Sequence, residues 1–116
     1  MVRTFLLLFL TAAMALAADI TGSWSFSVDT DMGSGTPTFT FKQTGEKITG
    51  NYRGQLGEAP LTGTVQGNKI TFSFEISPTG DKLTVVYTGT LEGDKAMKGA
   101  IDFGGQAKGT FTGTKN

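Results

Sequence analysis

The stretch that decides the fold is residues 20–28, which read Ile-Thr-Gly-Ser-Trp-Ser-Phe-Ser-Val. Apolar residues or glycine occupy its even positions, and serine or threonine occupies its odd positions. Successive side chains of a β-strand point to opposite faces, so a period of two predicts a strand with one buried face and one solvent face. Trp24, Phe26 and Val28 are therefore expected to point inward.

The same alternation continues through the rest of the chain. No window shows the 3.6-residue period of an amphipathic helix, so the predicted fold class is all-β. The predicted strands span residues 20–28, 37–41, 48–56, 61–65, 70–76, 83–91, 97–103 and 107–113.

Short turns rich in glycine, asparagine and aspartate separate these strands, as at Gly67-Asn68 and Gly93-Asp94. Such turns join antiparallel neighbours. Residues 57–60 are predicted to form another turn that ends on Pro60. The only longer connection runs from Asp29 to Thr36, and we expect it to be a flexible loop able to cover one end of the fold.

Glycine recurs on the predicted inward face in the pattern apolar-x-Gly-x-apolar, as at Gly50, Gly63 and Gly89. Glycine weakens a strand unless it allows a close approach or a sharp bend, so its repeated use fits a strongly coiled, closed sheet. An open sheet would leave two unpaired edges and an exposed apolar face. The sequence therefore predicts an eight-stranded antiparallel up-and-down β-barrel, with a two-sheet sandwich as the alternative.

The N-terminal residues predict export. Arg3 precedes an apolar run from Phe5 to Leu16, and Ala15-Leu16-Ala17 has the small-x-small form of a signal-peptidase site. We expect residues 1–17 to be a cleaved signal peptide and residues 18–116 to form the barrel domain, either periplasmic or extracellular.

Composition excludes several classes of function. The chain has no histidine and no cysteine, which removes histidine-based triads, thiol nucleophiles and the common zinc sites. Ten basic and ten acidic residues are interspersed, so neither nucleic acid nor a membrane is an expected partner of the processed chain. The carboxylates fall on outward faces or in turns. We expect no enzymatic activity, no cofactor and no metal.

The stretch from Ile20 to Trp24 resembles the opening of calycin barrels, the lipocalin and avidin group, in which a Gly-x-Trp on the first strand plugs the closed end. Ile48 to Tyr52 and Leu61 to Val65 resemble the second and third strands of avidin-type barrels. The resemblance implies the fold but not biotin binding, because Phe26 and Gly54 replace two polar biotin contacts of that family. The chain also resembles small exported bacterial barrels that have no assigned activity.

An eight-stranded barrel can be filled by its own side chains or can hold one small ligand. If the inward glycines leave room, the sequence predicts a pocket for a small apolar molecule, with Met32 of the long loop as a lid contact. The candidate lining residues are Trp24, Tyr52, Phe72, Phe74 and Tyr87.

Two other functions stay open from the sequence. A fully packed interior would indicate a structural or interaction module whose partner is another exported protein. Small calycin-like barrels also inhibit secreted hydrolases, and here the loop at residues 29–36 would have to make that contact.

Overall fold

The computed structural model describes residues 19–31 and 33–116. The predicted signal peptide, residues 1–17, and Met32 lie outside the described residues. The described part of the chain contains no helix with the length and apolar character that a membrane crossing requires.

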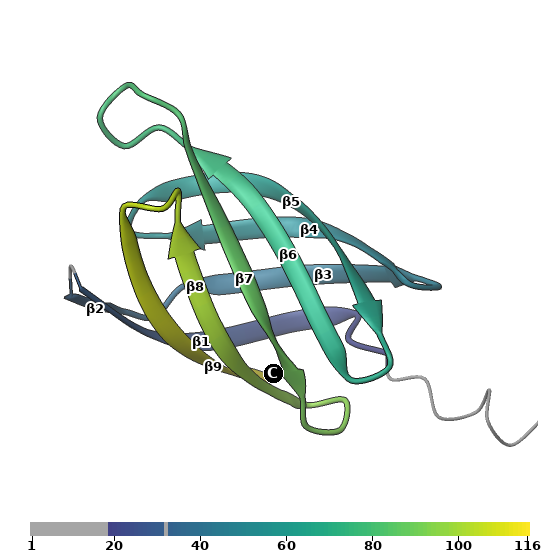
Figure 1. Ribbon diagram of the computed structural model, residues 1–116. Helices are drawn as coiled ribbons and strands as arrows, with labels where there is room; N and C mark the ends of the chain where they lie inside the picture. The colour runs from purple at the N-terminus through teal and green to yellow at the C-terminus, as the bar shows by residue number, and fades with distance from the viewer. Residues whose placement is uncertain (1–18, 32) are drawn as a thin grey trace, which may run out of the picture.

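Residues 19–31 and 33–116 form nine strands in one antiparallel sheet with the order β2-β1-β3-β4-β5-β6-β7-β8-β9, and β1 pairs with β9 to close it (Figure 1). The closing ladder runs from Trp24 opposite Lys115 to Thr30 opposite Gly109. The closed, eight-stranded up-and-down barrel predicted from the sequence is thus confirmed. The strands are β1 (Gly22–Thr30), β2 (Gly33–Gly35), β3 (Thr38–Thr44), β4 (Lys47–Gly54), β5 (Gly57–Gln66), β6 (Lys69–Ile76), β7 (Leu83–Leu91), β8 (Ala96–Phe103) and β9 (Ala107–Lys115).

The ninth strand, β2, comes from the segment expected to be a flexible loop. Residues 33–35 pair with residues 28–30 of β1, from Val28 opposite Gly35 to Thr30 opposite Gly33. The pairing is possible because β3 pairs only with residues 22–25 of β1. The end of β1 therefore has an open edge on that side, and β2 pairs with this edge. The segment is therefore a short β-hairpin that extends the barrel wall.

The connection between β4 and β5 also differs from the prediction. The turn consists of Gln55 and Leu56, and residues 57–60 already belong to β5. Leu56, predicted to point inward, has 36% of its surface exposed. The alternation of apolar residues runs through this tight turn without interruption, so it did not reveal where β4 ends.

Inward glycines stand where neighbouring strands come closest. A Cβ atom built on Gly50 would lie 1.8 Å from the Thr40 carbonyl oxygen, and one on Gly89 would lie 2.3 Å from the Lys98 carbonyl oxygen. Both obstacles are backbone atoms of an adjacent strand. These contacts explain why the sequence repeats glycine on the inward face, since only glycine permits so sharp a curvature.

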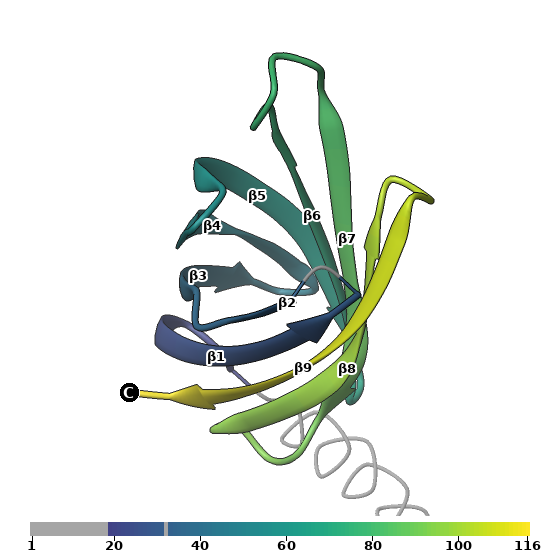
Figure 2. The ribbon, with the colours of Figure 1, turned by 90° about the vertical axis from the view of Figure 1, so that its left-hand side faces the viewer.

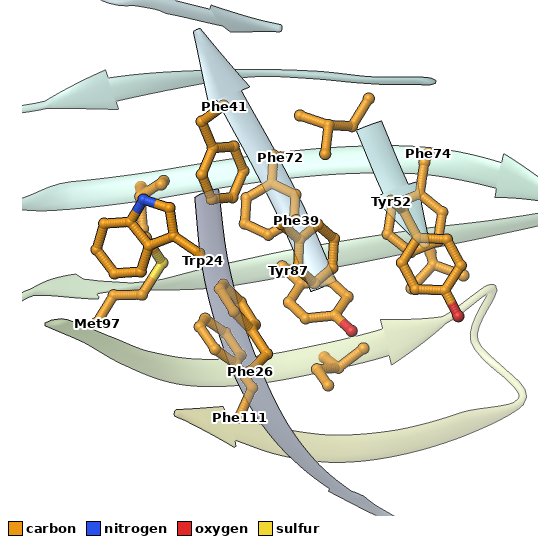
Figure 3. Packing of buried hydrophobic residues seen from close by; sticks show 14 of the residues in the cluster. Trp24, Phe26, Phe39, Phe41, Tyr52, Phe72, Phe74, Tyr87, Met97 and Phe111 are labelled. Carbon is orange, nitrogen blue, oxygen red and sulfur yellow. The ribbon is translucent and has the colours of Figure 1, made fainter. Parts of the chain in front are cut away.

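The barrel interior is an apolar cluster dominated by aromatic rings (Figure 3). Phe26 lies near its centre, stacked on Phe111 with centroids 5.3 Å apart and only 4.5 Å from the ring of Phe39. Among the described residues, no polar or charged residue is buried. Burial of these rings is the main stabilising contribution, because each removes a large apolar area from water.

One end of the barrel is closed by Trp24. Its side chain is fully buried, and its Nε1–H donates to the carbonyl oxygen of Ile20 at 2.9 Å. Ile20 is also fully buried and precedes β1, so the chain crosses this end before it enters the wall. Figure 3 shows Met97 beside Trp24 at this end of the cluster. The sequence therefore closes this end with its own side chains.

Candidate functional site

The opposite end of the barrel, here called the mouth, is formed by the β1–β2 hairpin and by three connections, those between β4 and β5, β6 and β7, and β8 and β9. In Figure 1 these segments lie toward the left, and Figure 2 views the barrel from that side. The short turns at the other end hold the strands together near Trp24. The longest connection, residues 77–82, rises from the mouth.

A cavity of about 220 Å³ opens at the mouth. Its lining is made of apolar and uncharged polar residues, with no acidic or basic side chain among them. We call it the mouth pocket, and its lining residues are Val28, Thr30, Gly33, Ser34, Gly35, Thr36, Pro37, Tyr52, Gln55, Leu56, Phe74, Tyr87 and Phe103.

Tyr52, Phe74 and Tyr87 line the inner part of the mouth pocket, and two stacked aromatic pairs hold these rings in place. Tyr52 of β4 stacks on Phe74 of β6, with centroids 4.3 Å apart and planes 12° from parallel. Tyr87 of β7 stacks on Phe72, with centroids 4.8 Å apart and planes at 19°. The neighbouring strands hold these rings in fixed positions, since Phe72 and Tyr87 are also opposite each other in the β6–β7 register. The pocket wall is therefore preformed by the packing of the core.

The two tyrosine hydroxyls point the same way, away from Trp24 (Figure 3). The hydroxyl oxygen of Tyr52 accepts a long hydrogen bond of 3.4 Å from the Leu56 backbone N–H. The Tyr87 side chain is only 2% exposed, and its hydroxyl has no hydrogen-bond partner among the described residues. No side-chain nitrogen or oxygen of these residues is both fully enclosed and unpartnered, so the Tyr87 hydroxyl must open onto the pocket.

Burial also sets the protonation of both tyrosines. Desolvation raises the pKa of Tyr87 far above its ordinary value near 10, and the nearby Tyr52 adds to that rise. Desolvation also raises the pKa of Tyr52, although the hydrogen bond from Leu56 opposes the change. Both side chains therefore stay neutral at physiological pH, and each keeps a hydroxyl proton to donate.

The β1–β2 hairpin is fixed over the mouth by hydrogen bonds. The Asp31 N–H donates to the carbonyl oxygen of Lys108 at 3.2 Å, and the Lys108 N–H donates to Asp31 Oδ2 at 3.2 Å. Within the hairpin, the Thr30 hydroxyl donates to the carbonyl oxygen of Gly33 at 2.8 Å. These bonds tie the hairpin to β9, so residues 33–36 form one side of the pocket entrance.

The structure places some of the candidate residues predicted from the sequence in the mouth pocket and others in the packed core. Tyr52, Phe74 and Tyr87 come together in the mouth pocket. Trp24 and Phe72 are not among its lining residues, because both lie fully buried in the packed part of the barrel. Met32 lies outside the described residues, although its neighbour Gly33 borders the pocket.

Several lining residues were missed by sequence reasoning. Val28, Pro37 and Phe103 were recognised as inward but not as members of the site, and Gln55 was not considered. Alternation assigns a side chain to a face of the sheet but not to a depth along the barrel. The signal that could have found them is position: each lies in a connection at the mouth or within three residues of one.

A larger hollow of about 1,200 Å³ extends from one side of the mouth, and it shares Val28, Ser34, Gly35, Thr36 and Gln55 with the mouth pocket. Many of its lining residues are outward threonines and lysines of β6 to β9, including Thr88, Thr110, Lys69 and Lys98. Threonine is a favoured solvent-face residue of a sheet, and binding sites for small molecules are usually enclosed and apolar. The smaller mouth pocket is therefore the better candidate site.

Comparisons with known proteins show the fold but no family. No family model and no curated protein matches the chain. Three solved structures are similar to it, and all of them are bound to DFHBI. A redesigned β-barrel, mFAP1, has a TM-score of 0.63 at 13% identity over 83% of this chain and 94% of that chain. A second redesigned β-barrel, mFAP0, has a TM-score of 0.58 at 14% identity over 83% of this chain and 98% of that one. The structure EF1p2_mFAP2b has a TM-score of 0.59 at 13% identity, covering 84% and 93% of the two chains.

Proposed function

We propose that this protein is an exported, non-enzymatic barrel that binds a small, uncharged aromatic molecule in the mouth pocket. The observation that carries the proposal is the preformed cavity of about 220 Å³ between the stacked rings and the β1–β2 hairpin. Export is inferred from the apolar segment and cleavage pattern of residues 1–17.

The chemistry of the lining supports a ligand of this class. Aromatic walls from Tyr52, Phe74, Tyr87 and Phe103 offer stacking and edge contacts to a flat ring. The lining has no charged side chain, so an ionic ligand would lose its hydration without compensation. It also has no acid or base to transfer a proton near neutral pH, which favours binding over catalysis.

The size of the pocket limits the ligand. Cavities that hold drug-sized molecules usually span about 300–1,000 Å³. The mouth pocket lies just below that range at about 220 Å³, so it suits a molecule of one or two rings. The solved barrels with the same fold are bound to DFHBI, and this supports the proposal that such a barrel can hold a small ligand at its interior.

The proposal is tested by calorimetric titration of the purified protein with DFHBI. We expect saturable one-to-one binding. Val28 lines the pocket, so Val28→Phe should fill part of the cavity and weaken binding at least tenfold. Val86 lies on the outward face of β7, so Val86→Phe makes the same change outside the pocket and should leave the affinity unchanged. Equal binding by both variants would overturn the assignment of the site.

A structural or interaction module is the second candidate, and the packed half of the barrel favours it. Trp24, Phe39 and Val85 are fully buried, and much of the interior has no room for a ligand. A protein that binds neither DFHBI nor other one-ring or two-ring aromatic probes, yet unfolds cooperatively at high temperature, would support this second candidate instead.

A further inference from the structure

The Tyr87 hydroxyl is a polar group on the aromatic inner side of the mouth pocket, and the packing of the core does not by itself account for it. A core position that needed only bulk would be filled by phenylalanine, as it is at the opposite position, Phe72. The side chain is 98% buried, since only 2% of its surface is exposed. Its hydroxyl nevertheless opens onto the pocket and has no hydrogen-bond partner among the described residues, so it is available to a molecule bound there.

We propose that Tyr87 selects the ligand: it donates a hydrogen bond to an acceptor, such as a carbonyl oxygen, on the buried end of an aromatic molecule. This inference rests on the proposed function and refines it to one class, neutral aromatic compounds with a carbonyl group on or next to the ring. A pure hydrocarbon would fit the walls of the pocket but would leave the hydroxyl unpaired.

The geometry favours Tyr87 over Tyr52 in this role. The Tyr52 oxygen already accepts the Leu56 N–H, which ties that side chain to the β4–β5 turn. Tyr87 has no such attachment among the described residues, and its ring is fixed by stacking on Phe72 and by an edge contact with Phe39 at 5.3 Å. Its hydroxyl is thus held rigidly and is free to donate into the pocket.

The protonation of Tyr87 supports the same role. A tyrosine with an ordinary pKa near 10 is already neutral at physiological pH, and the burial that raises the pKa of Tyr87 keeps it a neutral donor at alkaline pH as well. The O–H of Tyr87 therefore favours a hydrogen-bond acceptor on the ligand over a hydrogen-bond donor. A ligand presenting an ammonium or amide N–H at this point would find only the tyrosine oxygen, and the lining offers no carboxylate to balance its charge.

The experiment compares two probes, acetophenone and ethylbenzene, which share a ring and a two-carbon chain and differ in the carbonyl oxygen. Their affinities are measured by amide NMR titration of the wild-type protein, Tyr87→Phe and Tyr52→Phe. We expect Tyr87→Phe to weaken acetophenone about fivefold and to change ethylbenzene less than twofold, which is the range of one hydrogen bond. Tyr52→Phe is the matched control and should keep the preference of the wild-type protein.

The outcomes separate the two proposals. If Tyr87→Phe affects both probes equally, or if Tyr52→Phe alone removes the preference, the role of Tyr87 is wrong while the mouth pocket stands. If neither probe binds the wild-type protein, the proposed function fails and this inference fails with it.

A second measurement does not depend on a variant. The infrared carbonyl stretch of acetophenone bound to the wild-type protein should lie at a lower frequency than in a hydrocarbon solvent, because a hydrogen bond weakens the C=O bond. A frequency equal to that in hydrocarbon would overturn the inference even if Tyr87→Phe does not fold.

Discussion

The ring of Tyr52 lies flat against the ring of Phe74, with centroids 4.3 Å apart and planes 12° from parallel. The two residues come from β4 and β6, and β5 separates these strands in the sheet. Their contact therefore reaches across the inside of the barrel wall, and it makes one continuous aromatic side of the mouth pocket.

This pair leads to the first prediction. Phe74→Leu keeps the position apolar but removes the stack, which is worth about 0.5–1.5 kcal/mol beyond buried area. We expect affinity for DFHBI to fall severalfold. Phe41→Leu is the control, because Phe41 stacks on Phe39 outside the pocket lining and its loss should affect stability only. Calorimetry and urea denaturation measure the two effects. Equal loss of binding in both variants would show that Phe74 has no special part in the site.

The second prediction concerns the closely packed glycines. Gly50→Ala places a Cβ against the Thr40 carbonyl oxygen and should destabilise the barrel by at least about 2 kcal/mol, since backbone must move to relieve the overlap. Gly35→Ala is the matched control, because the nearest atom is Gln55 Oε1 at 3.7 Å. It should change the unfolding free energy by less than about 1 kcal/mol. A stable Gly50→Ala protein would contradict the β3–β4 register.

The third prediction concerns the closed end. Trp24→Phe leaves the Ile20 carbonyl without its donor and opens space beside Met97, so we expect a loss of about 1–3 kcal/mol in unfolding free energy. Binding of DFHBI should not change in the folded variant, because Trp24 does not line the mouth pocket. A selective loss of binding, without a loss of stability, would mean that the ligand lies deeper in the barrel than proposed.

The fourth prediction concerns alkaline pH. The pKa of Tyr87 is raised in the folded protein, so above about pH 10 the unfolded chain releases a proton that the folded chain keeps. Stability is therefore complete below pH 10 and should fall above it by up to about 1.4 kcal/mol per pH unit for this group.

The variant Tyr87→Phe isolates this effect, because it removes the group while keeping its ring. Urea denaturation between pH 9 and pH 11.5 should show a shallower decline of stability in the variant than in the wild-type protein. The chain has only two tyrosines, so tyrosinate absorbance at 295 nm should rise together with unfolding. Ionisation of both tyrosines in the folded protein near pH 10 would show that the Tyr87 hydroxyl is not desolvated.

The sequence was sufficient to predict the closed barrel ahead of a two-sheet sandwich, because its two strongest signals both favour a closed sheet. Alternation fixed the faces of the strands, and the repeated inward glycines required tight curvature. Gly50 and Gly89 show the cause directly, since each lies against a carbonyl oxygen of a neighbouring strand. Export of the chain stays a prediction.

The errors have an equally physical origin. Leu56 was assigned inward because alternation persists through a two-residue turn. The β1–β2 hairpin was predicted to be a loop, because Gly33 and Gly35 give no apolar pattern. Their pairing with β1 also depends on the residue at which the pairing of β1 with β3 ends, which the sequence does not show.

The aromatic residues of the candidate site could be predicted from the sequence, but their depth along the barrel could not. Tyr52, Phe74 and Tyr87 could be chosen as inward aromatic residues, but so could Trp24 and Phe72, which lie in the packed part of the barrel. The difference between these two groups is their depth along the barrel axis. That depth depends on the stagger between strands, and stagger is a property of the closed sheet as a whole.

The most direct test of the mouth pocket is amide NMR mapping of the wild-type protein during a titration with DFHBI. Binding at the mouth predicts saturable shifts concentrated on Gly33, Leu56 and Phe103, which line the mouth pocket and not the outer hollow, with no change around Trp24. Shifts concentrated on Thr88, Thr90, Thr110 and Thr112 would place the ligand in the outer hollow and contradict the account. The absence of any saturable shift would show that the barrel does not take up this ligand.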